Sequence, residues 1–182
     1  MLKFIGKLIL KYWGFTIHGF FSNEIKKTIV IVAPHTSNWD FVIGVSAKYA
    51  LGIKANYIGK KSLFYFPYGF LFRYLGGAPV DRSKSSNQVQ QIVDIFNSRD
   101  RFILGLSPEG TRGKTRVIKT GFYHIAHMAK VPIIMMRLDF KEREIEFSEP
   151  FVTTGNMESD FTKIKSFFDG AIGYKPLQAF EF

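Results

Sequence analysis

The stretch Ile29-Val30-Ile31-Val32-Ala33-Pro34-His35-Thr36-Ser37-Asn38-Trp39-Asp40 joins an unbroken apolar run to a short polar segment. The run is rich in β-branched residues and is short enough for a strand, so it predicts a buried strand over residues 28–33. Pro34 ends this strand. We therefore expect His35 to lie on a loop at the end of a strand.

Four residues separate His35 from Asp40, and this pair supports two interpretations. A histidine held by a carboxylate is a general base for proton abstraction. The spacing of Ser37 and Asp40 also fits a capping box, in which Asp40 bonds back to the start of its own helix. The two interpretations are compatible, because a helix that begins at Ser37 would fix Asp40 close to the loop that carries His35.

Length and composition limit the classes of protein that this chain can be. Its 182 residues, 46% of them apolar, predict one globular domain over residues 1–182. The absence of cysteine from the sequence excludes a disulfide scaffold, a thiol nucleophile and cysteine-ligated zinc. The net charge of +10 favours anionic partners, which include nucleic acid, anionic lipid and phosphorylated small molecules.

Residues 1–15 predict a basic amphipathic helix, with Lys3, Lys7 and Lys11 on one face and apolar residues on the rest. Such a helix binds at a membrane interface, or it packs on the sheet as an ordinary helix; both interpretations stay open. The segment is too charged for a signal-peptide core and too short to span a bilayer. The aromatic stretch 64–74 lies beside basic residues, which suits a membrane interface, the stacking of single-stranded bases, or a core segment with solvated ends.

Strand patterns and helix patterns alternate along the rest of the chain. Residues 143–147 alternate charged and apolar side chains, which predicts an edge strand. The expected fold is a single α/β domain with a central mixed, largely parallel sheet flanked by helices. The expected strands are 15–21, 28–33, 55–59, 78–80, 102–106, 131–140 and 143–147, and the expected helices are 38–51, 87–97, 121–129 and 156–168, with 62–75 helical or looped.

A second strand-and-loop segment, Ser107-Pro108-Glu109-Gly110-Thr111-Arg112, follows the buried strand 102–106. Ligands of open α/β sheets collect outside the carboxyl ends of the strands, so two such loops face one crevice if their strands are parallel neighbours. Arg112 offers a planar fork for phosphate or carboxylate. The alternative is a proline-led turn with a surface ion pair between Glu109 and Arg112.

Other polar segments carry weaker signals. Lys119 precedes an expected helix, whose N-terminus would attract anions. His124 and His127 have a spacing that can bind metal, but no third ligand accompanies them, so we favour a structural role and expect no metal site. Ser107 lacks the context of a nucleophile elbow.

Three segments, taken together and in order, resemble the glycerolipid acyltransferase family, which acylates lysophosphatidate or glycerol-3-phosphate. His35 and Asp40 match its His-x4-Asp motif, and Gly77, Val80 and Arg82 match its Gly-x-x-Val-x-Arg segment. Residues 109–112 match its Glu-Gly-Thr-Arg motif, and residues 131–134 resemble its fourth, apolar block. With the strands that carry them, these motifs give a motif-bearing core of 28–140.

The resemblance implies that His35 deprotonates the acceptor hydroxyl and that Asp40 orients its imidazole. It also implies a thioester donor as co-substrate, either acyl-CoA or an acyl group on acyl carrier protein, and no further cofactor. The implied location is peripheral, at the cytoplasmic face of a membrane. The substrate-binding residues that it implies are Lys60, Lys61, Arg82, Glu109, Gly110, Thr111 and Arg112.

Three functional hypotheses remain at this level. The first is a membrane-associated acyltransferase, acting on a glycerol-phosphate, a lysolipid or another lipid acceptor. The second is a non-catalytic protein that binds anionic lipid. The third, a nucleic-acid binder, ranks last, because the basic residues are scattered and match no recognised nucleic-acid motif.

Overall fold

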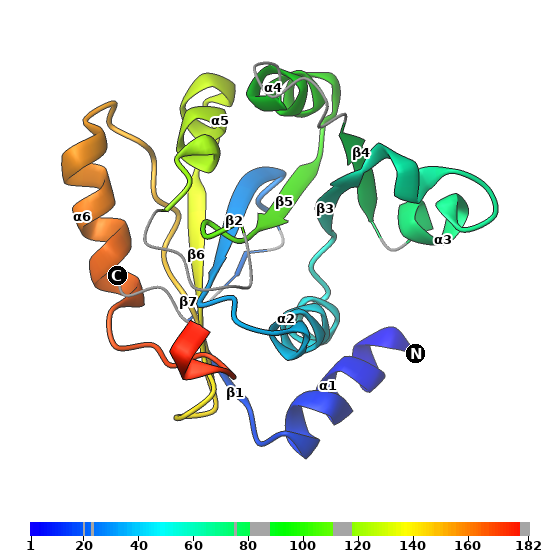
Figure 1. Cartoon of the computed structure of the whole chain (residues 1–182), viewed down its shortest axis with the longest axis vertical. Helices are drawn as coiled ribbons and strands as arrows, with labels where there is room; N and C mark the ends of the chain where they lie inside the picture. The colour runs from blue at the N-terminus through cyan, green and yellow to red at the C-terminus, as the bar shows by residue number, and fades with distance from the viewer. Residues whose placement is uncertain (20, 23, 75, 81–87, 111–117, 179–182) are drawn as a thin grey trace.

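The computed structural model describes residues 1–19, 21–22, 24–74, 76–80, 88–110 and 118–178. Strands and helices alternate along most of this chain and pack into three layers (Figure 1). In chain order the elements are α1 (Leu2–Tyr12), β1 (Thr16–His18), β2 (Lys27–Ala33), α2 (Asn38–Leu51), β3 (Ala55–Lys60), the 3-10 helix η1 (Lys61–Phe64), α3 (Gly69–Tyr74), β4 (Gly77–Val80), α4 (Gln88–Ser98), β5 (Phe102–Leu106), α5 (Gly121–Ala129), β6 (Ile133–Asp139), β7 (Glu144–Phe147), α6 (Met157–Phe168) and the 3-10 helix η3 (Pro176–Gln178).

The strands form one sheet in the order β1-β7-β6-β2-β5-β3-β4. Within the described chain, β6 and β7 pair antiparallel and the other five pairings are parallel. The predicted fold, a mixed and largely parallel sheet flanked by helices, is therefore confirmed.

The prediction that residues 143–147 form an edge strand is wrong. Strand β7 lies between β1 and β6, so both of its backbone edges are paired. Its alternation has another cause: Ile145 and Phe147 face the core, whereas Glu144 and Glu146 are only half-buried on the other face. The alternation thus indicated a half-solvated face and carried no information about the strand's neighbours.

Two hydrophobic cores enclose the sheet, which explains why residues 29–33 of β2 are all apolar. Ile29 and Ile31 pack against α4, α5 and α6 on one face, and Val30 packs against α1 and α2 on the other. Because successive side chains of a strand point to opposite faces, a central strand covered on both sides needs apolar residues at every position.

Helix α1 packs on α2 and leaves much of its own surface exposed. Gly6 allows the close approach of the two helices, since a Cβ atom there would lie 2.5 Å from the carbonyl oxygen of Ser46. Leu10 is buried in the same contact, whereas Phe4 and Leu8 are exposed. No helix in the described part of the chain is both long enough and apolar enough to cross a membrane.

Candidate active site

The segment after β2 begins α2 with a capping box. The hydroxyl of Ser37 accepts a hydrogen bond from the Trp39 N–H at 2.9 Å. In return, the buried Asp40 carboxylate accepts bonds from the N–H groups of Thr36 and of Ser37, the latter at 2.6 Å. The capping interpretation is therefore confirmed, and it fixes the side chain of Asp40 within the first turn.

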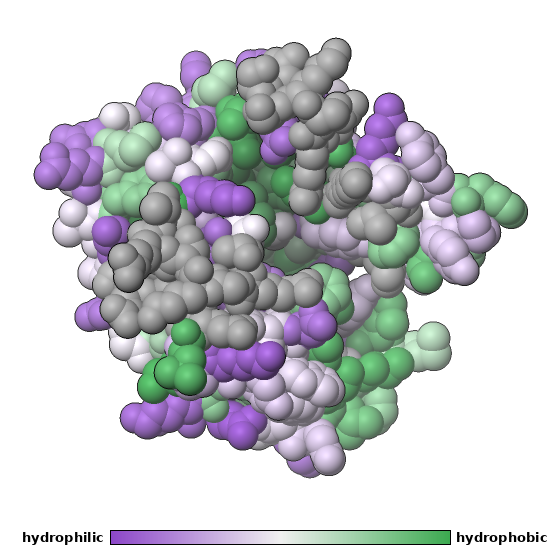
Figure 2. Space-filling view, viewed as in Figure 1, coloured by the Kyte–Doolittle hydropathy of each residue, from purple (hydrophilic) through white to green (hydrophobic). Residues whose placement is uncertain are grey.

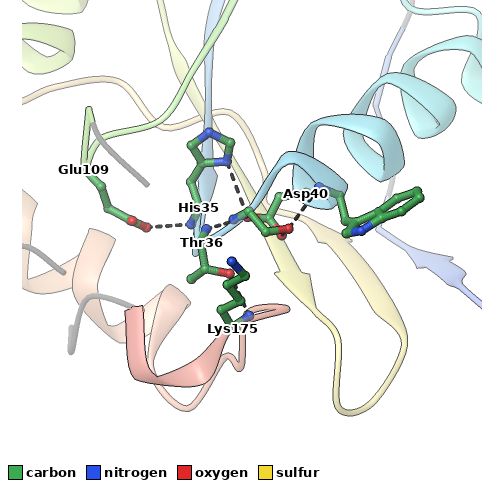
Figure 3. A network of polar contacts seen from close by, with 7 residues as sticks. His35, Thr36, Asp40, Glu109 and Lys175 are labelled. Atoms are coloured by element: carbon green, nitrogen blue, oxygen red, sulfur yellow. Dashed lines mark hydrogen bonds and ion pairs between the residues drawn. The ribbon is translucent and has the colours of Figure 1, made fainter. Parts of the chain in front are cut away.

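The same carboxylate also faces the imidazole of His35. The Nδ1 atom of His35 lies 3.5 Å from Oδ2 of Asp40, and the other ring nitrogen points away from the carboxylate (Figure 3). Such contacts are often long before substrate binds and shorten in the complex. The structure thus brings the predicted base and its orienting carboxylate together.

Glu109 holds the backbone of His35 from the opposite side. Strands β2 and β5 are parallel neighbours in which Ile31 pairs with Leu106, so the loops after them meet at one edge of the sheet. There Oε1 of Glu109 accepts a hydrogen bond of 2.8 Å from the His35 N–H (Figure 3).

The environment of Glu109 changes its acidity. Its side chain is fully buried, and Oε2 has no hydrogen-bond partner among the residues that the structure describes. Burial raises the pKa of Glu109 from 4.5 to about 7, although the bond from the His35 N–H opposes that rise. Near neutral pH this carboxyl group is therefore present in both protonation states.

A cavity of about 1070 Å³ opens beside His35 and Asp40 (Figure 2). Beyond the polar pair its walls are mainly apolar, and Gly44 and Gly105 widen it because they have no side chain there. Burial lowers the pKa of Lys48, which lies in the wall contributed by α2. Apolar wall residues include Val32, Val45, Ile58, Val80, Ile92, Leu106, Phe122 and Met136.

Four of the predicted site residues lie in this region: His35, Asp40, Glu109 and Gly110. Lys61 is exposed on η1 and is not part of the cavity wall. The remaining predictions, Arg82, Thr111, Arg112 and the side chain of Lys60, lie outside what the structure describes.

Lys119 is a further basic residue at the cavity. Gly110 has φ +65°, and a Cβ atom there would lie 2.6 Å from Cδ of Lys119, so the lysine packs directly over the glycine. Its position before an expected helix was only a weak sign of an anion site, because one basic residue before a helix is common. Among the described residues it is a cation in the cavity wall beside the Glu109 loop.

A C-terminal strap, which we define as residues 171–175, braces the loop that carries His35. The backbone N–H of Lys175 donates to Oγ1 of Thr36 at 3.0 Å, and a Cβ atom on Gly173 would lie 2.6 Å from Cγ2 of Thr36. The ring of Tyr174 lies 6.4 Å from that of Trp39. Sequence reasoning missed this contact, which joins residues 139 positions apart.

His127 has ordinary structural contacts on α5. Its ring stacks on Tyr123 at 6.2 Å, and its Nδ1 lies 3.0 Å from Oγ1 of Thr153.

Comparison with known proteins identifies both a family and a fold. The family described as Acyltransferase matches residues 15–138. The 1-acyl-sn-glycerol-3-phosphate acyltransferase of Limnanthes alba is 28% identical over 142 residues, which cover 74% of this chain and 49% of that protein. The protein of the same name from Cocos nucifera is 34% identical over 87 residues, 44% of this chain and 28% of that one. This chain thus spans about half or less of the length of these relatives.

A solved structure has the same fold. The crystal structure of the 1-acyl-sn-glycerophosphate (LPA) acyltransferase PlsC from Thermotoga maritima superposes with a TM-score of 0.61 and 20% sequence identity. The match covers 92% of this chain and 75% of the other.

Proposed function

The chain belongs to the Acyltransferase family, and from this premise we propose that it is an O-acyltransferase acting on a glycerolipid. It would move a fatty acyl group from a thioester to a hydroxyl of a glycerol-phosphate or lysolipid acceptor. The observation that carries this proposal is the His35–Asp40 pair, held by Glu109 at the edge of a largely apolar cavity.

His35 would act as the general base. Its ring nitrogen that faces away from Asp40 removes the proton of the acceptor hydroxyl, whose oxygen attacks the thioester carbonyl carbon. Asp40 keeps the imidazole in one tautomer and stabilises the imidazolium that forms. The tetrahedral intermediate then collapses, the C–S bond breaks, and the imidazolium returns its proton to the departing thiolate.

The cavity supplies room for an acyl chain. Its mainly apolar walls favour burial of methylene groups, and each CH₂ removed from water contributes roughly 0.8 kcal/mol. The donor would be acyl-CoA or an acyl group on acyl carrier protein, and the reaction needs no further cofactor.

Lys119 is positioned to attract the anionic head of an acceptor, since it lies over Gly110 in the wall of the same cavity. Arg82 and Arg112 would add two forked contacts to phosphate, as the family resemblance implies.

Helix α1 would attach the enzyme to the cytoplasmic face of a membrane as a peripheral protein. Phe4 and Leu8 are exposed, and Lys3, Lys7 and Lys11 lie on the same short helix. Exposed apolar residues combined with lysines suit the interface of an anionic bilayer.

The test is the exchange of His35 for alanine. We expect H35A to lower kcat for acyl transfer from a thioester to lysophosphatidate by about 10²- to 10⁴-fold, because the base is lost. Release of free thiol and formation of the diacyl product measure the reaction. H124A, which changes an exposed histidine on α5, is the matched control and should keep full activity.

Two results would overturn parts of this proposal. If H35A keeps full activity, His35 is not the general base. A wild-type protein that binds lipid but releases no thiol with any lysolipid supports the non-catalytic lipid-binding alternative.

A further inference from the structure

The segment between β3 and β4 forms a small lobe that projects from the β4 end of the sheet (Figure 1). We call residues 61–74, which comprise η1 and α3, the aromatic lobe. Phe66, between η1 and α3, is 97% exposed. Six of the ten residues from 65 to 74 are exposed large hydrophobics: Tyr65, Phe66, Tyr68, Phe70, Leu71 and Tyr74.

The inner side of the lobe is ordered by specific contacts. Phe64 is buried, and its ring lies 6.0 Å from that of Phe72. Arg73 donates from Nη1 to the Phe64 carbonyl at 3.0 Å and lies over the Phe64 ring. Gly69 lets the backbone close on this centre, since a Cβ atom there would lie 2.0 Å from the Phe64 oxygen. The outward aromatic residues are therefore presented by a built scaffold.

The lobe is fixed to the wall of the cavity. The hydroxyl of Tyr57 donates to the Phe72 carbonyl at 3.2 Å. On its other side the Tyr57 ring lies 6.5 Å from that of Phe41, which is exposed at the start of α2. Both Tyr57 and Phe41 line the cavity, so Tyr57 joins the lobe to the part of the cavity wall that lies next to the start of α2.

The chemistry of the outward surface fits the interface of a lipid bilayer. Its phenylalanines and leucine suit the acyl region, and its tyrosines suit the headgroup level, where amphipathic rings concentrate. Lys61 and Arg73 add positive charge for anionic headgroups. Apolar residues of α1 and of the lobe appear on the same side of the molecule, with the hollow between them (Figure 2).

We propose that the aromatic lobe is a second membrane-binding element, which inserts into an anionic bilayer together with α1. This inference rests on the proposed function, because it assumes that the enzyme takes its substrates from a membrane. The two elements would hold the cavity over the bilayer, so that a lipid enters between them.

The test measures binding to vesicles made of equal parts phosphatidylcholine and phosphatidylglycerol. We expect the double variant Phe66→Ser/Phe70→Ser to bind at least about tenfold more weakly than the wild type, because two inserted rings are lost. Leu177→Ser/Val152→Ser is the matched control, since both positions are exposed apolar residues outside α1 and the lobe, and it should bind like the wild type.

The α1 variant Phe4→Ser/Leu8→Ser separates this inference from the proposed function. If it loses binding while the lobe variant binds like the wild type, the lobe inference is overturned and the α1 attachment stands. If the wild type itself does not bind the vesicles, both membrane assignments are overturned, while the thiol-release assay still judges the acyl transfer.

A structural or self-association role of the lobe gives different results. The inference requires the lobe variant to keep wild-type activity with a water-soluble, short-chain thioester and acceptor. It also requires that, without vesicles, the lobe variant has the same sedimentation coefficient as the wild type. Loss of soluble-substrate activity, or loss of a dimer that the wild type forms, would overturn the lobe as a membrane element.

Discussion

Asp40 illustrates how one side chain can serve both folding and chemistry. Its carboxylate caps the start of α2 through the Thr36 and Ser37 N–H groups and also faces the His35 imidazole. The cap and the pair need the same geometry, because a carboxylate bound by two backbone groups cannot swing away from the imidazole. The local spacing predicted both the cap and the contact with His35, since all of these residues lie within six positions of the chain.

Exchange of Asp40 for asparagine should separate these two roles. D40N keeps an oxygen that can accept a backbone hydrogen bond but removes the negative charge that would stabilise the proposed imidazolium. We expect kcat to fall by about 10²- to 10⁴-fold, with a smaller effect on KM. Steady-state kinetics measure both constants. Ser37→Ala is the contrasting variant: it should lower the free energy of unfolding by about 1 kcal/mol through the lost cap and leave kcat nearly unchanged.

Glu109 should make the stability of the fold depend on pH. Burial raises the pKa of Glu109 from 4.5 to about 7, so between these values the folded protein keeps a proton that the unfolded chain releases. The free energy of unfolding therefore falls as the pH rises through this window, by about 3 kcal/mol for the full shift. In Glu109→Gln this contribution is absent, because glutamine does not titrate. Urea denaturation at pH 4 to 8 measures the difference.

Equal pH profiles for the wild type and Glu109→Gln would show that Glu109 does not titrate in this range. The same variant keeps an oxygen for the His35 N–H, so it should retain more activity than Glu109→Ala, which removes the acceptor of this part-buried hydrogen bond.

At the scale of elements, two parallel strands and one strap assemble the site. The adjacency of β2 and β5 places the His35 and Glu109 loops at one edge, as the order of strand, proline and polar loop suggested. The strap contact and the interior position of β7 depend on long-range packing, for which the local pattern holds no signal. Local geometry was therefore predictable from the sequence, whereas the choice of distant neighbours was not.

The strap should act on the active-site loop through Gly173. Its φ lies outside the left-handed region, so its glycine is needed for space alone, against Cγ2 of Thr36. We expect Gly173→Ala to lower the free energy of unfolding by about 1–3 kcal/mol and to lower kcat, because the loop is displaced. Thermal denaturation and steady-state kinetics measure the two effects.

Thr36→Ser is the control for this contact, since it removes Cγ2 and keeps the hydroxyl that accepts from Lys175. In the double variant Gly173→Ala/Thr36→Ser, the free energy of unfolding lost in Gly173→Ala should be partly recovered. Purely additive effects would show that the two residues do not interact.

At the scale of the whole molecule, the proposed membrane attachment would use both the net charge of +10 and the exposed apolar residues. Positive charge would bring the protein to an anionic surface over long range, and apolar insertion would hold it there at short range.

Added salt should therefore weaken the electrostatic part of membrane binding and leave the apolar part largely unchanged. Binding to phosphatidylglycerol-containing vesicles should weaken as ionic strength rises, because the screening length falls from about 10 Å at 0.1 M to about 3 Å at 1 M. Replacement of Lys3, Lys7 and Lys11 by glutamine should flatten this dependence. Vesicle co-sedimentation across a salt series measures it, and an unchanged salt slope in the triple variant would exclude α1 as the source of the electrostatic attraction.

The capping box has a consequence for how the integrity of this site can be observed. The amide protons of Thr36 and Ser37 are held by the same carboxylate that faces His35. Their rates of hydrogen exchange with deuterated water thus report how often the first turn of α2 opens. Each such opening also releases Asp40 from its imidazole. Two backbone amides therefore report how often the His35–Asp40 pair comes apart while the rest of the protein stays folded.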